Sequence, residues 1–197
     1  YDISCSLVGS EMCIRDSVNI LQPGPGVGGH CIAVDPWFIV AQNPQQAKLI
    51  RTAREVNDGK PHWVVDRVKA AVADCLADTN KRASEVKIAC FGLAFKPNID
   101  DLRESPAMGI AQNIAQWHKG EMLVVEPNIH QLPKKLDGLC QLATLDDALA
   151  RADVLVMLVD HNEFKAIKGD AVQQQYIVDT KAVSYTHLRA HETAANL

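Results

Sequence analysis

Between residues 84 and 183, short apolar runs alternate with segments of helical periodicity, and this alternation constrains the fold more than any other feature. The apolar runs predict strands at residues 86–92, 122–125, 154–159 and 176–179. The run Val154–Val159 is apolar throughout, as expected of a parallel strand that helices cover on both faces. The pattern therefore predicts an α/β domain with a doubly wound, Rossmann-like parallel sheet.

Helix-start signals stand between these predicted strands. Ser105 is a suitable N-cap, with Pro106 at the first helical position. Thr144 begins a sequence similar to a capping box, which predicts a short helix through Ala152. Such helices are the crossovers that parallel strands require.

Residues 47–80 form a separate helical region before this domain. The sequence Asn57-Asp58-Gly59 predicts a break, and Pro61 suits the first turn of a second segment. Apolar residues from Val65 to Leu76 then continue one face. We expect a long, kinked helix that connects domains, or equally one that carries a subunit interface.

A glycine- and proline-rich stretch, residues 22–36, presents a single thiol, Cys31, followed four residues later by Asp35. Gly26, Gly28 and Gly29 permit close backbone approach to a ligand, and the prolines stiffen the loop. A nucleophile requires fixed, close access to its substrate, so the stretch indicates covalent catalysis. The alternative is a tight surface turn beside a buried structural cysteine.

Within that stretch, residues 24–29 contain a literal G-x-G-x-x-G. The dinucleotide fingerprint requires a helix that opens at its last glycine. We do not expect Asp35-Pro36 to open a helix, because proline disfavours the α region for the preceding residue. We therefore reject a dinucleotide-binding turn here.

Three cations follow the predicted sheet at places where an anion could bind. Lys96 and Lys181 come after strands, and Arg103 precedes the helix start at Ser105. Carboxyl ends of parallel strands meet at one edge of a sheet, so these side chains could reach a diphosphate together. The alternative is that each is an ordinary solvated side chain.

Composition narrows the class of partner. The net charge of −4 gives no reason to expect nucleic acid, and no apolar run is long enough to cross a bilayer. The six cysteines lack zinc-type spacing and are expected to be reduced thiols in a cytoplasmic protein, and no metal is expected.

Two long motifs together resemble the UDP-glucose/GDP-mannose dehydrogenase family. The first is Gly-Pro-Gly-Val-Gly-Gly-His-Cys31 with Asp35-Pro36, and the second runs from Gly92-Leu-Ala-Phe-Lys96 to Arg103-Glu-Ser105-Pro106. The resemblance covers about residues 18–183, the carboxyl-terminal part of such an enzyme. The sequence is most similar to a bacterial branch that oxidises an N-acetylated UDP-hexosamine for cell-surface polysaccharide biosynthesis.

The resemblance implies a mechanism and a set of site residues. It implies oxidation of a sugar alcohol to an acid by two hydride transfers to NAD, through a thioester on Cys31, with Asp35 assisting proton transfer. The remaining positions follow from the same motifs: substrate contacts by Gly28, Phe95, Lys96 and Lys181, and cofactor contacts by Arg103 and Cys31. It also implies a homodimer for the full-length enzyme. In the family an NAD-binding domain comes first, and the sequence before residue 18 does not match it.

Other functions remain open at this stage. The chain could be a UDP-sugar-binding and dimerisation module without turnover, or belong to a dehydrogenase for another UDP-hexose. A Cys31–His30 hydrolase or acyltransferase is disfavoured, because adjacent residues rarely bring their side chains together. We expect a catalytic loop at 18–46, a connector helix at 47–80 and a UDP-sugar-binding domain at 84–183. The irregular ends, 1–17 and 184–197, are interpreted as non-native extensions.

Overall fold

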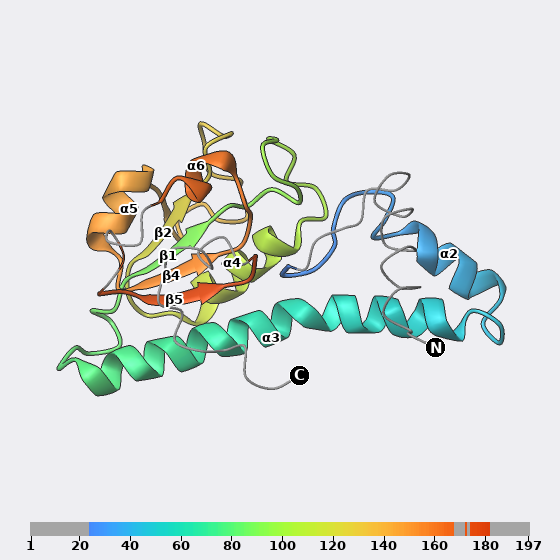
Figure 1. Ribbon diagram of the computed structural model, residues 1–197, viewed down its shortest axis with the longest axis horizontal. Coiled ribbons are helices and arrows are strands. Elements are labelled where there is room, and N and C mark those ends of the chain that lie inside the picture. Colours follow the sequence, from blue (N-terminus) through green and yellow to red (C-terminus); the bar gives the residue numbers. More distant parts are fainter. Residues whose placement is uncertain (1–23, 168–171, 173, 182–197) are drawn as a thin grey trace, which may run out of the picture.

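The computed structural model describes residues 24–167, 172 and 174–181 of the 197-residue chain (Figure 1). The described strands are β1 Ile88–Phe91, β2 Met122–Val125, β3 Gln141–Leu142, β4 Val154–Met157 and β5 Tyr176–Asp179. The described helices are α2 Asp35–Gln42, α3 Lys48–Asp78, α4 Pro106–Trp117, α5 Leu145–Arg151 and α6 Asn162–Lys165. The predicted extensions 1–17 and 184–197 lie outside the described residues.

The five described strands form one parallel sheet in the order β3-β2-β1-β4-β5. The chain runs outward from β1 to β3 and then returns to place β4 on the other side of β1. The strand order therefore reverses between β1 and β4, which is where open α/β sheets bind ligands. The predicted doubly wound parallel sheet is confirmed; the two-residue β3 and the four-residue α6 were not predicted.

Each face of the sheet has its own hydrophobic core, because side chains alternate along a strand. On one face, Ile88 packs with Val68 of α3 and Ile114 of α4 in a single buried cluster. On the other face, Phe91 meets Phe164 of α6 edge-on, with ring centroids 5.4 Å apart. Helices thus cover both faces, which explains why the strands are apolar throughout.

Helix α3 continues without interruption through Pro61, so the break expected at Asn57-Asp58-Gly59 does not occur. Proline removes one main-chain hydrogen bond, but the contacts that α3 makes on both sides of Pro61 keep the helix whole. Local propensity is here overridden by tertiary packing.

The two halves of α3 have different surroundings, as Figure 1 shows. The second half runs beneath the sheet and buries its valines, as predicted, and the Tyr176 hydroxyl donates to the Asp78 carboxylate at 2.7 Å. The first half packs against α2, and its side chains Leu49 and Val56 are exposed. The helix therefore connects the sheet to the α2 region.

Helix α2 corrects a second expectation, because it begins at Asp35 with Pro36 in its first turn. A proline is tolerated there, since the N–H that it lacks would have no helical partner. The Asp35 N–H donates to the Cys31 carbonyl at 2.8 Å, so the turn begins at the cysteine. The helix still does not open at Gly29, so a dinucleotide-binding turn remains without support.

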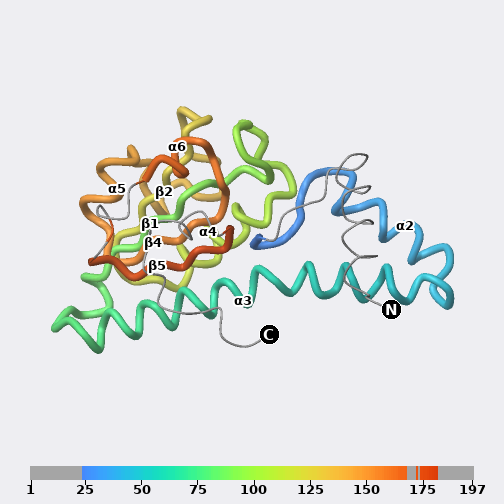
Figure 2. The backbone as a smooth tube through the Cα atoms, in the orientation of Figure 1, coloured from blue at the N-terminus to red at the C-terminus, as the bar shows by residue number. Residues whose placement is uncertain are grey.

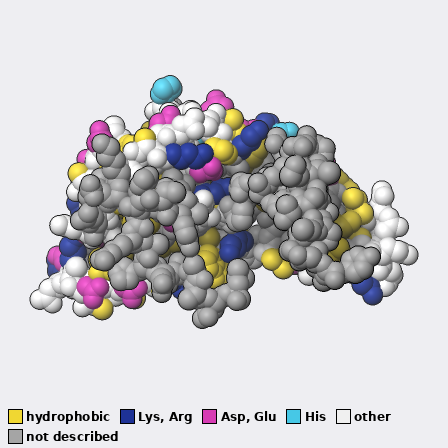
Figure 3. Space-filling view, in the orientation of Figure 1, with side chains coloured by type: hydrophobic (Ala, Val, Ile, Leu, Met, Phe, Trp, Pro, Cys, Tyr) yellow, Lys and Arg dark blue, Asp and Glu magenta, His cyan; other side chains and the backbone are white. Residues whose placement is uncertain are grey.

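Loop 24–34 leads from the edge of the sheet to α2, as the blue part of the tube in Figure 2 shows. Beyond it, α2 exposes hydrophobic side chains, including Phe38 and Ile39. Yellow side chains accordingly appear over the α2 end of the molecule in Figure 3. Basic and acidic side chains are interspersed over the opposite end, which contains the sheet. Of the described helices, none combines the length and apolarity that crossing a membrane requires.

Candidate active site

The glycine-rich loop is docked against the start of α4, and Gly28 makes the closest approach. A Cβ atom at Gly28 would lie 2.3 Å from the Glu104 carbonyl oxygen and 2.5 Å from Cδ of Pro106. Real Cβ atoms do not come so close, so this position accepts no side chain without movement of backbone. The loop's glycine content therefore has a packing cause at this position.

Gly29 brings the loop into contact with a second part of the sheet domain. Its φ of +94° favours glycine, and its N–H donates to the Glu104 carbonyl at 3.2 Å. A Cβ atom at Gly29 would lie 3.1 Å from the Phe95 ring. The aromatic side chain predicted to contact substrate therefore lies against the loop that carries Cys31.

We predict that Gly28→Ala destabilises the protein by about 1–3 kcal/mol, the usual cost of overpacking a closely packed site. Thermal unfolding of the purified full-length protein measures it. The matched control is Gly59→Ala, because a Cβ there meets nothing within 4 Å in the described structure and Gly59 lies inside α3. That control should stabilise by about 0.5–1 kcal/mol through helix propensity. Equal melting temperatures for the two variants would contradict the close packing of Gly28 against Glu104 and Pro106.

Cys31 is exposed, whereas Cys75 and Cys90 are buried and Cys140 is half-buried among the described cysteines. Burial raises the pKa of the Cys90 thiol, which makes it a poor nucleophile. The interpretation of Cys31 as a buried structural cysteine therefore does not fit. Its carbonyl accepts hydrogen bonds from the N–H groups of Val34 at 3.0 Å and Asp35 at 2.8 Å. This helical turn places residues 31 and 35 on the same side.

Lys96 and Lys181 line one small pocket of about 20 Å³ beside the ends of β1 and β4. Lys181 is largely covered, with its side chain 18% exposed, and its Nζ lies 3.8 Å from an Asp160 carboxylate oxygen. A Cβ at Gly24 would lie 2.8 Å from the Lys181 side chain, so the loop also packs here. These two predicted cations are brought together.

Arg103 is not among the residues of that pocket. Its guanidinium binds Asp101 through Nε at 2.9 Å and Nη2 at 2.6 Å, and its side chain is 72% exposed. The hydrogen bonds from Arg103 lower the pKa of the Asp101 carboxyl to about 2. The expectation that three cations converge at one point thus holds for the two lysines and not for Arg103.

A buried carboxylate, Glu126, follows β2 and was not predicted as a site residue. Its Oε2 accepts hydrogen bonds from the N–H groups of Leu93 at 2.7 Å and Ala94 at 3.1 Å, and lies 3.2 Å from Nε2 of His161. Burial alone would raise the pKa of Glu126, but the bonds from His161, Leu93 and Asn128 outweigh it and lower that pKa. The carboxylate is therefore held in its charged form.

His161 is fully buried and completes this arrangement. Its Nδ1 accepts the N–H of Asn98 at 2.9 Å, which assigns the ring proton to Nε2, facing Glu126. Asn98 has a positive φ of 61°, a conformation uncommon outside glycine. Glu126 and His161 thus hold both ends of the loop that carries Phe95 and Lys96. Their places at strand ends were visible in the sequence, but their pairing was not.

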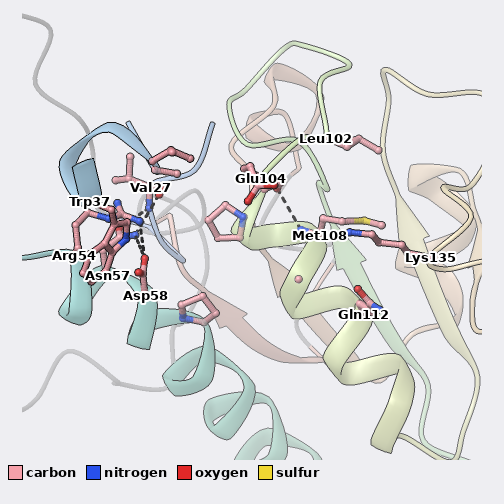
Figure 4. Close-up of a pocket in the computed structure, with 16 residues that line it drawn as sticks. Val27, Trp37, Arg54, Asn57, Asp58, Leu102, Glu104, Met108, Gln112 and Lys135 are labelled. Atoms are coloured by element: carbon pink, nitrogen blue, oxygen red, sulfur yellow. Dashed lines mark hydrogen bonds and ion pairs between the residues drawn. The ribbon is translucent and has the colours of Figure 1, made fainter. Parts of the chain in front are cut away.

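A larger cavity of about 460 Å³ lies between α4 and the α2–α3 region (Figure 4). One wall carries Trp37, Arg54, Asn57 and Asp58, and the facing wall includes Gln112 of α4. Neither Cys31 nor the two lysines line it. Among the described residues, no cluster of three or more histidine, cysteine or acidic side chains could hold a metal ion.

Two family models match the chain. Residues 3–59 match the central domain of the UDP-glucose/GDP-mannose dehydrogenase family, and residues 89–185 match its UDP binding domain. The first match includes part of the predicted extension 1–17, and the domain boundaries proposed above stay predictions.

Individual relatives agree with these models. The chain is 89% identical, over 84% of its length, to a UDP-N-acetyl-D-mannosamine dehydrogenase of Salmonella typhi, and 57% identical to an NDP-N-acetyl-D-galactosaminuronic acid dehydrogenase of Ralstonia nicotianae. It spans only 40% and 37% of these relatives. A solved UDP-N-acetyl-mannosamine dehydrogenase from S. aureus is 35% identical, with a TM-score of 0.65 over 93% of this chain and 40% of that one.

Proposed function

Because this chain belongs to the UDP-glucose/GDP-mannose dehydrogenase family, we propose that it is part of an NAD-dependent dehydrogenase that converts UDP-N-acetyl-D-mannosamine to UDP-N-acetyl-D-mannosaminuronate. The difference between 89% and 57% identity supports this sugar over an N-acetylgalactosamine derivative. The observation that carries the proposal is an exposed thiol, Cys31, on a loop packed against Phe95 of the UDP-binding domain.

Cys31 would act as the covalent nucleophile once the sugar C6 alcohol has become an aldehyde. Its thiolate adds to the aldehyde carbon, forming a carbon–sulfur bond, and the oxygen takes up a proton. Loss of that proton from the oxygen, and of a hydride from the carbon to NAD as the oxidant, would leave a thioester. Water then adds to the thioester carbon, and the carbon–sulfur bond breaks to release the carboxylate and the thiol. Exposure of Cys31 gives the sulfur the access that this sequence requires.

Asp35 would assist this chemistry from the same side of the turn. A carboxylate one helical turn from the thiol can accept a proton from the hydrolytic water or orient that water. On the sheet side, Lys96 and Lys181 would bind the diphosphate, while Phe95 and Gly28 would contact the substrate. The shared pocket of the two lysines at the strand ends supports this assignment.

The described residues could form only a small part of a binding site for a nicotinamide cofactor. The Arg103 side chain is 72% exposed, so its guanidinium can contact a cofactor phosphate while it binds Asp101. Gly92, which follows β1, is packed against Val159 and is not open to a pyrophosphate. When bound, NAD would supply the hydride acceptor, with Cys31 and Arg103 beside it.

We also propose a homodimer, on the ground that Phe38, Ile39, Leu49 and Val56 are exposed along α2 and the first half of α3. A cytoplasmic location and a role in cell-surface polysaccharide biosynthesis stay predictions from the sequence. The four cysteines in the described part of the chain are free, which suits a reducing compartment.

The second candidate is a UDP-sugar-binding module without turnover in the 197-residue chain itself. The poor fit to a whole dinucleotide favours it, because Arg103 alone cannot replace a phosphate-binding crevice. We expect this chain to bind UDP weakly and NAD more weakly, and to form no NADH. Calorimetry with each ligand, and absorbance with both, provide the measurement.

The full-length protein that contains this chain provides the test of the main proposal. With UDP-N-acetyl-D-mannosamine and NAD, it should form two NADH for each acid released. No NADH with this substrate, but NADH with another UDP-hexose, would change the sugar assignment. If no NADH forms with any UDP-hexose, the proposal that the protein is a dehydrogenase is refuted.

A further inference from the structure

One side chain of α3, Asn57, binds both main-chain groups of a single residue in the glycine-rich loop. Its Oδ1 accepts the N–H of Val27 at 2.7 Å, and its Nδ2 donates to the Val27 carbonyl at 3.2 Å. Only an amide side chain offers a donor and an acceptor in this arrangement. Asparagine is a poor residue for a helix interior, so its value here lies in these tertiary bonds.

Neighbouring side chains hold Asn57 in this orientation. Its Nδ2 also lies 3.3 Å from the Asp58 carboxylate, which in turn binds Arg54 at 2.6 Å. The Arg54 side chain is only 10% exposed, so it is itself held in place. Figure 4 shows this group gathered with Val27 at one end of the large cavity. The amide therefore has few alternative positions.

The loop is consequently attached at two points before it reaches the thiol. Asn57 holds it at Val27, and Glu104 at the start of α4 accepts the N–H of Gly29. Cys31 follows directly, and its carbonyl receives the first bonds of the turn into α2. Phe95 and Lys96, which are proposed to bind the substrate, lie on a different loop, which Glu126 and His161 hold. The two loops touch, since a Cβ at Gly29 would lie 3.1 Å from the Phe95 ring, but Asn57 binds only the loop that carries the thiol.

We propose that Asn57 is a positioning residue that sets the place of Cys31 for its attack on the aldehyde. This inference rests on the proposed function. Oxidation of the alcohol does not need the thiol, whereas formation of the acid does. Loss of the Asn57 bonds should therefore impair the thiol-dependent half of the reaction in particular.

The test is Asn57→Ala in the full-length protein. We expect the rate of acid formation to fall roughly 100-fold, the effect of displacing a reacting group by about 1 Å. The dissociation constant for UDP-N-acetyl-D-mannosamine should change less than about threefold. That is well below the tenfold change that a loss of about 1.4 kcal/mol in binding free energy would cause. An aminooxy probe should trap released aldehyde, and NADH formed per acid should exceed the wild-type ratio. Asn57→Asp, which keeps the acceptor and loses the donor, should show an intermediate loss.

The matched control is Asp66→Asn, an exposed position farther along α3, which should behave as wild type. Wild-type acid formation in Asn57→Ala would overturn the proposal. So would a fall in rate with an unchanged NADH-to-acid ratio and a parallel loss of substrate affinity, since that indicates general damage. Hydrogen exchange at the Val27 amide, which needs no turnover, should quicken in Asn57→Ala. This readout keeps the attachment testable if the wild-type protein forms no NADH, a result that would refute the proposed function alone.

Discussion

Replacing Cys31 by serine in the full-length protein is expected to lower acid formation at least about 1,000-fold, which corresponds to about 4 kcal/mol in the activation barrier. Serine preserves the shape of the side chain, but its hydroxyl is a far weaker nucleophile than a thiolate at neutral pH. Binding of the UDP-sugar should change little, because Lys96 and Lys181 lie on the sheet domain and Cys31 does not line the pocket that they share.

Three measurements on Cys31→Ser check this expectation: acid formed, NADH formed, and substrate affinity by calorimetry. Cys140→Ser is the control, since Cys140 is half-buried beside Leu136 and far from the loop in sequence. Intact-mass analysis with substrate present should show an adduct on wild-type protein and none on Cys31→Ser. Acid formation at the wild-type rate would remove Cys31 from the mechanism.

Replacing Glu126 by alanine is expected to destabilise the protein by about 3–5 kcal/mol, the cost of leaving buried charged or polar partners uncompensated. The carboxylate receives the main-chain N–H groups of Leu93 and Ala94 and the imidazole of His161. All of these are donors. Glu126→Gln should also be destabilising, because its amide group would face the N–H of Asn128 with a donor of its own.

The same carboxylate predicts a pH dependence of stability. Its pKa in the folded protein is lower than the ordinary value, so folding favours the charged form. Its contribution is complete above the ordinary glutamate pKa of the unfolded chain, and it is lost as the pH falls through the folded pKa. The difference in unfolding free energy between wild type and Glu126→Gln should therefore shrink on acidification below that ordinary value.

Denaturant unfolding of the full-length protein at several pH values measures both effects. Glu85→Gln is the control, because Glu85 is a surface carboxylate that pairs with its neighbour Arg82. It should change stability much less at neutral pH. A Glu126→Ala protein as stable as this control would show that the buried arrangement does not hold the sheet edge together.

Much of the fold follows from local patterns that the sequence displays directly. The Ser105 hydroxyl caps α4 by accepting the N–H of Met108, and the Thr144 hydroxyl caps α5 in the same way, as predicted. Local patterns correctly placed Pro106 at the start of α4 but failed at two other prolines. Both Pro36 and Pro61 lie in helices, because a first-turn position tolerates proline in α2 and packing maintains α3.

The candidate site was only partly accessible to the same reasoning. Cys31, Asp35, Lys96 and Lys181 were singled out because they lie in or after the glycine-rich loop or after strand ends, and their roles stay predictions. Asn57 was not, since its sequence neighbours predict a helix break rather than a contact. Its partner Val27 is 30 residues away along the chain.

By itself, the sequence determined the parallel sheet, the buried face of α3 and the thiol at the end of a glycine-rich loop. These depend on periodicity, capping and conformational preference, which act over a few neighbouring residues. The tertiary structure alone decided that Asn57 holds Val27 and that Glu126 pairs with His161. It also decided that Arg103 turns to Asp101 instead of joining the lysines. Such pairings depend on which distant segments meet and which buried donors need acceptors, and no local pattern encodes that choice.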